Sequence, residues 1–249
     1  LSGGSNLVVN SAGGAISALQ INGTTSEDVT LNASGGSTNT VVVGAIGTGA
    51  GKINTVALTG SGSVRLNGNI TTDGNTGNSV TVTGPALIGG AVTVDTTANA
   101  GDTTGAVSFT STVNDVAANT NSLTIKSGGA TAGITGVVGG SAKLTALDIN
   151  GTAGAGAITL GGIGGGAEGV SGATTVGNTG TASITFSGTT YNANAQTYKA
   201  AAGNNFKMTN GATTTFTSTD DAISFQTADI LLSGGSNLVV NSAGGAISA

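Results

Sequence analysis

The sequence predicts an all-β protein folded as a right-handed parallel β-helix, which is one form of β-solenoid. Three observations carry this prediction. Short segments alternate β-branched and polar residues, Gly and Asn punctuate those segments, and similar strings recur along the chain. The alternative fold is a row of β-sandwich domains of roughly 80–110 residues, but the shorter repeats and the absence of Trp favour the solenoid.

The predicted strands are short segments in which successive side chains would point to opposite faces of a sheet. They are residues 6–11, 28–33, 40–44, 63–72, 79–84, 91–97, 106–112, 122–127, 157–161, 183–190, 213–219 and 222–227. No segment combines the periodicity and the capping residues of a helix.

Tight turns are indicated where Gly follows Asn or Asp, because both dipeptides tolerate positive φ. Such pairs occur at 22–23, 67–68, 73–74, 150–151 and 210–211. They do not by themselves distinguish parallel from antiparallel sheets.

Residues 1–18, LSGGSNLVVNSAGGAISA, recur without a substitution as residues 232–249, an offset of 231. Shorter matches lie inside this unit, for example ISALQINGT (16–24) and LTALDINGT (144–152). We therefore expect residues 1–231 to be one full solenoid repeat and residues 232–249 to begin the next identical repeat. At about 20 residues and ~4.8 Å per turn, the unit would hold about 11–12 turns and span roughly 55 Å.

The composition fits an uncharged β-solenoid better than an ordinary soluble domain. Charged residues are 7% of the chain, against about 25% in typical domains. Hydrophobic residues at 37% and a mean hydropathy of +0.25 exclude disorder. The net charge of −5, without a basic cluster, predicts neither nucleic-acid nor anionic-membrane binding. No stretch is apolar enough for membrane insertion.

We expect no catalytic, cofactor-binding or metal-binding residue. The absence of His and Cys excludes Ser-His-Asp, Cys-His and typical zinc sites. The string GTGAGK (47–52) resembles a phosphate loop, but Gly47 and Gly51 are one residue too close and Ile53 replaces the hydroxyl residue. The only adjacent acidic pairs, Glu27-Asp28 and Asp220-Asp221, lie beside turn signals and are interpreted as solvated turn residues.

Two further surface hypotheses are open. Tyr191 and Tyr198 lie in a cluster of aromatic residues between 186 and 225, which the sequence predicts to be core, with a small exposed contact patch as the alternative. Threonine-rich strands such as 81–83 and 213–219 raise an ice-binding hypothesis, which would need the same Thr pair on every turn. Only a few segments carry one.

The strings SITFSGTTYNANAQTYKAAAGNNF (183–206), TTTFTSTDDAISF (213–225) and LTALDINGTAGAGAITLGG (144–162) resemble the repeats of filamentous-haemagglutinin-like and autotransporter-like large secreted bacterial proteins. This resemblance implies a right-handed parallel β-helix, secretion across the bacterial envelope, and a role as an adhesive or structural fibre.

We therefore expect a non-catalytic structural repeat of an extracellular or bacterial cell-surface fibre, stalk or sheath. Its expected partner is a further copy of itself, end to end and in lateral bundles, with a cell-surface polysaccharide or a host or neighbouring cell surface as further candidates. The alternative function is a polysaccharide-binding or polysaccharide-degrading β-helix, which would need acids and Lys or Arg clustered along one groove.

Overall fold

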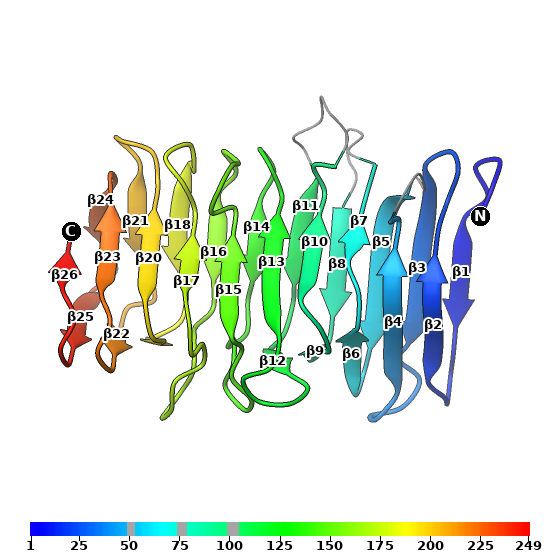
Figure 1. The fold of residues 1–249 in the computed structure, drawn as a ribbon, viewed down its shortest axis with the longest axis horizontal. Helices are drawn as coiled ribbons and strands as arrows, with labels where there is room; N and C mark the ends of the chain where they lie inside the picture. The colour runs from blue at the N-terminus through cyan, green and yellow to red at the C-terminus, as the bar shows by residue number, and fades with distance from the viewer. Residues whose placement is uncertain (49–52, 74–78, 99–104) are drawn as a thin grey trace.

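The computed structural model describes residues 1–48, 53–73, 79–98 and 105–249. These residues form β-strands and no helix, and the strands stack into an elongated solenoid with the two termini at opposite ends (Figure 1). Every pairing between the described strands is parallel, including β1 with β3 and β22 with β25. The predicted parallel β-solenoid is confirmed, and the alternative of tandem β-sandwiches is excluded.

One side of the solenoid is a continuous ten-stranded parallel sheet, which we call face A. Its strands, in order along the axis, are β1 (Leu7–Asn10), β3 (Glu27–Ala33), β5 (Ile53–Gly60), β8 (Ser79–Thr83), β11 (Ala106–Phe109), β14 (Ala132–Ile134), β16 (Ile158–Leu160), β18 (Ser183–Phe186), β21 (Asn205–Met208) and β24 (Asp229–Leu232). Each strand therefore belongs to a different turn of the chain.

The rest of the wall divides into two faces. Near the N-terminus β2 (Ile16–Ile21) and β4 (Thr40–Ile46) extend across both of them. Face B then continues through β7 (Ile70–Thr71), β10 (Val92–Asp95), β13 (Ser122–Lys126), β15 (Ala146–Ile149), β17 (Thr174–Val176), β20 (Gln196–Lys199), β23 (Ile223–Gln226) and β26 (Ile247–Ser248).

Face C continues from β4 along the third side. It contains β6 (Ser63–Leu66), β9 (Ala86–Ile88), β12 (Val113–Asp115), β19 (Thr190–Asn192), β22 (Thr213–Ser218) and β25 (Asn237–Ser242). Single bridges through Val138 and Ile163 connect β12 to β19. A complete turn thus passes face A, face C and face B in sequence.

The solenoid has about nine turns, fewer than the 11–12 expected for the unit. Face A advances by 22 residues from Leu7 to Val29 and by 27 from Val29 to Val56, so a turn averages about 25 residues instead of about 20. The additional residues per turn lie in the corners between strands, where segments such as 116–121 form surface loops. The expected turn length was too short because it allowed too little chain for these corners.

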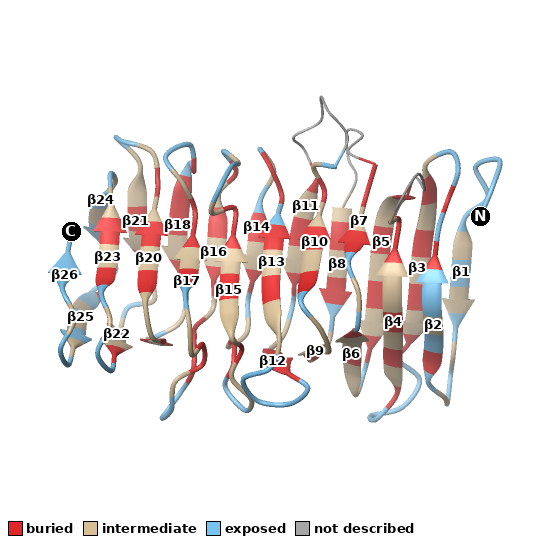
Figure 2. Ribbon diagram, in the orientation of Figure 1, coloured by how far each residue is buried: buried red, intermediate tan, exposed pale blue. Residues whose placement is uncertain are grey.

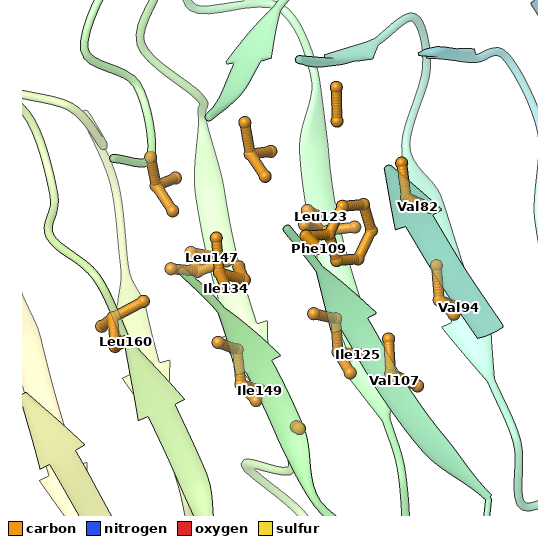
Figure 3. Close-up of a cluster of buried hydrophobic side chains, with 14 of the residues drawn as sticks. Val82, Val94, Val107, Phe109, Leu123, Ile125, Ile134, Leu147, Ile149 and Leu160 are labelled. Carbon is orange, nitrogen blue, oxygen red and sulfur yellow. The ribbon is translucent and has the colours of Figure 1, made fainter. Parts of the chain in front are cut away.

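The core is a set of stacked apolar columns enclosed by the three faces. Figure 2 shows the corresponding buried positions recurring on strand after strand along the axis. On face A, Val29, Val56, Val80 and Val107 occupy equivalent positions on successive turns and are at most 1% exposed. In the middle turns, Phe109 and Ile134 from face A project toward Leu123 and Ile125 from face B (Figure 3). Full burial of such a side chain contributes about 1.5–3 kcal/mol, so hydrophobic burial is repeated turn by turn along the axis.

The corners depend on residues that tolerate unusual backbone geometry or close stacking. Asn150, in one of the predicted Asn-Gly turns, has a φ of 53°. Its buried side chain accepts a hydrogen bond from the Ser127 backbone N–H at 2.8 Å and donates one to Ser127 Oγ at 2.9 Å. At Gly188, a Cβ atom would lie 1.7 Å from the carbonyl oxygen of Gly161 on the neighbouring turn. Neighbouring corners therefore pack backbone against backbone.

Candidate functional site

Glu27 is buried and organises a corner near the N-terminus. Its carboxylate accepts hydrogen bonds from the backbone N–H groups of Thr24 at 2.8 Å and Thr25 at 2.9 Å, and from Thr25 Oγ1 at 2.9 Å. The Thr25 backbone N–H contributes most to lowering the pKa of Glu27 to about 2, and the other hydrogen bonds outweigh the opposing effect of burial. The interpretation of Glu27 as a solvated turn residue is wrong.

Asp28 also departs from the solvated turn expected of it, because it lies within β3, whereas Asp220 and Asp221 do lie in a turn. Asp28 is half-buried, and its carboxylate accepts hydrogen bonds from Asn54 Nδ2 at 2.9 Å and Thr55 Oγ1 at 2.7 Å. Asp220 is exposed and Asp221 is half-buried in the turn after β22. Within the described ranges, no group of three or more acidic residues could hold a metal ion.

Asp115 is a second buried carboxylate, which the sequence analysis did not single out. It accepts hydrogen bonds from the backbone N–H groups of Thr120 and Asn121, both at 2.8 Å, and from Asn121 Nδ2 at 2.6 Å. Burial acts to raise its pKa, but these hydrogen bonds outweigh burial and hold the pKa below the ordinary value of 3.8. Asp115 closes the loop that follows β12, so its role is structural. The polar residues Asn119, Thr120 and Asn121 at the end of this loop are the sequence signal for a turn.

All seven aromatic side chains are buried, including Tyr191 and Tyr198. Tyr191 stacks on Phe216 with ring centroids 4.7 Å apart, and Phe186 meets both rings edge-on at 5.0 Å. Tyr191 Oη donates a hydrogen bond to the Leu160 carbonyl at 2.6 Å. The predicted core assignment is therefore confirmed, and the exposed contact patch is wrong. Over residues 1–48, 53–73, 79–98 and 105–249, no aromatic ring lies at the surface as a platform for a sugar.

Among the described residues, the two ion pairs are isolated from each other. Lys126 Nζ lies 3.6 Å from Asp95 Oδ2, and Lys143 Nζ lies 3.0 Å from Glu168 Oε2. Each of these pairs connects neighbouring turns. Arg65 Nε donates a hydrogen bond to Asn67 Oδ1 at 2.7 Å. These contacts do not assemble the acids and bases that polysaccharide cleavage along a groove would need.

The outer surface of face A is uncharged over most of its length. One outward column follows the register of the strands and contains Thr30, Ala57, Thr81, Ser108, Gly133, Thr159 and Thr185, all of them half-buried. On the next turn the column reaches a charged residue, Lys207. β8 carries Thr81 and Thr83, but the next turn carries Ser108 and Thr110, so the Thr pair does not repeat from turn to turn. Face A presents small hydroxyl and methyl groups without the regular pairing that the ice-binding hypothesis requires.

Most of the exposed large apolar residues among those described lie in the first and last turns, and Val116 is an exception in a middle turn. Figure 2 shows that exposed positions are frequent on the strands of these terminal turns. Val8 is 62% and Leu19 is 91% exposed at the N-terminal end, and Ile247 is 52% exposed at the C-terminal end. Here the first and last strands also present a backbone edge that has no neighbour on one side. The two open ends, together with face A, form the candidate functional surface.

Residues 49–52, most of the string that resembles a phosphate loop, lie outside the described residues. Within the part of the chain that is described, no helix has the length and apolarity to cross a bilayer. Comparison with protein-family models, with curated proteins and with solved structures returned no match. The functional proposal therefore rests on the geometry of the solenoid.

Proposed function

We propose that this chain is a structural repeat of an extracellular fibre, stalk or sheath, and that it acts mechanically without catalysing a reaction. The observation that carries the proposal is the uninterrupted stack of about nine parallel turns. Such a stack extends in one dimension by the addition of further turns. A following copy of the same unit would continue it, and residues 232–249 already repeat residues 1–18.

The fold suits a load-bearing role. Backbone hydrogen bonds between parallel strands run along the axis through every turn, for example from Val107 N to Thr131 O at 3.0 Å and from Ala132 N to Ala157 O at 3.1 Å. Axial tension would act on many such bonds together. Location at a bacterial cell surface and an adhesive role are part of the proposal, and the repeat strings described in the sequence analysis support them.

Face A provides a surface for lateral contact between fibres. Its outward column from Thr30 to Thr185 carries no charge, so two copies could approach without electrostatic repulsion. The charged side chains on face A lie toward its ends, with Asp28 on β3, Lys207 on β21 and Asp229 on β24. On face B they are spread along the middle turns, where Asp95, Lys126, Asp148 and Lys199 lie on its strands. We therefore assign lateral bundling to face A.

The axial periodicity of the native fibre tests the proposal. Cryo-electron microscopy should give a spacing of ~4.8 Å along the axis and a unit repeat of about 43 Å, which corresponds to nine turns at that spacing. This repeat is shorter than the roughly 55 Å expected from the sequence alone, because there are fewer turns. Separate globular particles without the axial spacing would contradict a continuous fibre.

A further inference from the structure

The identical segments at the two ends of the chain lie on different faces of the solenoid. In the first copy, Leu7–Asn10 forms β1 and pairs with Val29 to Asn32 on face A. In the second copy, the same four residues lie within β25 and pair with Thr214 to Thr217 on face C. Ile16 and its copy Ile247 differ likewise, because Ile16 pairs with Val41 and Ile247 pairs with Ile223 on face B. The same sequence thus lies on different faces of the solenoid at the two ends of the chain.

The strand before the segment explains the difference. In the second copy, β24 already occupies face A and pairs with β21. The next strand must therefore lie on face C. In the first copy, residues 1–6 form no strand, and β1 takes the place on face A next to β3.

The segment can change faces because its local structure stays the same. Gly3 and Gly4 have φ values of 64° and 74°, and Gly234 and Gly235 have values of 64° and 81°. Leu7 and Val9 face inward and Val8 outward in β1, and their copies Leu238, Val240 and Val239 keep these orientations in β25. The glycine turn and the strand that follows it therefore keep the same local structure on either face, and the same side chains point to the core.

We propose that the joint between consecutive units adopts the second arrangement. The segment then lies on faces C and B, and the next strand of face A is supplied by residues 27–33 of the following copy. The joint turn spans 30 residues, counted from Ile230 to the following copy's Val29, and one 231-residue unit closes in nine turns. The occupant of the C-terminal open end is thus a second copy in a defined register. This inference rests on the proposed function, since it assumes consecutive units.

Disulfide mapping tests the joint, because the chain has no Cys and every introduced pair is unique. The protein is a chain of two consecutive units, residues 1–231 followed by residues 1–249. One variant carries Thr215→Cys and Val239→Cys, which are partners in the second arrangement. The other carries Val239→Cys and, in the following copy, Thr30→Cys, which are partners in the first arrangement. Strands ~4.8 Å apart place both pairs within the Cα separation of a disulfide.

After mild oxidation and peptide mapping, the first variant should form its disulfide as fully as an interior control with Thr81→Cys and Ser108→Cys. The second variant should form none. In the single 249-residue chain, Val8→Cys with Thr30→Cys should form a disulfide, which shows that this pairing is available at a free N-terminal end.

A disulfide only in the second variant would overturn the proposal, and so would a joint where neither pair bonds while the interior control does. These outcomes leave the solenoid of each unit intact and so do not touch the fibre proposal. Failure of the fibre proposal would instead appear as the loss of the axial periodicity in native material.

Discussion

Two buried carboxylates hold corners of the solenoid, and each of them makes stability depend on pH. The pKa of Glu27 is lowered to about 2 in the folded chain from an ordinary value of 4.5. Its contribution to stability is therefore complete above pH 4.5 and disappears as the pH falls toward 2. Asp115 acts in the same direction from an ordinary value of 3.8.

Replacing Glu27 with Gln should remove the larger part of this acid sensitivity. We expect Glu27→Gln to lower the melting temperature at neutral pH, because Thr24 and Thr25 lose an ionised acceptor. The drop in melting temperature between pH 4.5 and 2 should become smaller than in the native chain. Circular dichroism melts across this range measure both effects. Asp115→Asn is the comparison variant, and it should reduce this drop less than Glu27→Gln does. Equal slopes for the native chain and Glu27→Gln would refute the assignment.

The two tyrosines should resist ionisation until the fold opens. Burial raises the pKa of Tyr191 and of Tyr198 above the ordinary 10.0, and the proximity of Tyr191 adds to the effect on Tyr198. Because the unfolded chain can ionise at pH 10, stability should be lost as the pH rises above that value. With no Trp present, tyrosinate absorbance should rise together with the loss of the β circular-dichroism signal. If tyrosinate absorbance instead rose near pH 10.0 while the β signal persisted, a tyrosine ring would be exposed in the folded chain.

At the scale of the element, the aromatic stack distinguishes the C-terminal turns. Phe186 meets Tyr191, Tyr198 and Phe216 edge-on, each at 5.0 Å. Phe109 is equally buried but lies among aliphatic residues (Figure 3). The same residue type therefore occurs in two core environments of one fold.

Phe186→Ala should cost more than its matched control Phe109→Ala. Truncation of a buried Phe costs about 3–5 kcal/mol, and each lost aromatic pair adds about 0.5–1.5 kcal/mol. Since turns contact mainly their neighbours, the damage should stay local. Hydrogen exchange should show faster opening of β18 to β23 in Phe186→Ala, with β3 to β8 unchanged. A uniform increase along the chain would mean that the solenoid unfolds as one unit.

The predicted segments overlap β3, β4, β8, β13 and β22, but they miss the longest strand, β5, as well as β2 and short strands such as β14 and β17. Alternation over five residues located β8 and β13, whereas β14 and β17 have three residues each and show too little alternation to detect. The segments 63–72 and 183–190 were each predicted as one strand, but a corner divides them into β6 with β7 and β18 with β19. These corners are fixed by contacts with the neighbouring turn, about 25 residues away, which local periodicity does not contain.

The candidate surface was harder to predict than the strands, because it too depends on which residues of neighbouring turns lie side by side. The absence of His and Cys was sufficient to argue against familiar catalytic sites. The inward direction of Glu27 follows from the start of β3 and its register. The uncharged column on face A becomes visible only when residues from seven turns are aligned.

At the scale of the whole molecule, lateral association should depend on face A. Thr159→Lys with Thr185→Lys introduces two charges on adjacent turns of its outward column and should disperse fibre bundles, because like charges then face one another. Thr175→Lys with Thr197→Lys makes the matching change on face B and should leave bundles intact. Electron microscopy and sedimentation measure both variants. Equal dispersal by the two variants would place the contact elsewhere.

The unequal turns have a consequence for how such a fibre can vary in length. Successive turns differ in residue number, from 22 to 27 on face A, and in the size of their core side chains. A chain displaced by a single turn would set Phe186 against positions shaped for Leu160. Only a shift by the complete unit restores every match. Gain or loss of genetic copies would therefore change the reach of the fibre in discrete steps of one unit, and intermediate lengths would be selected against by misfit of the core.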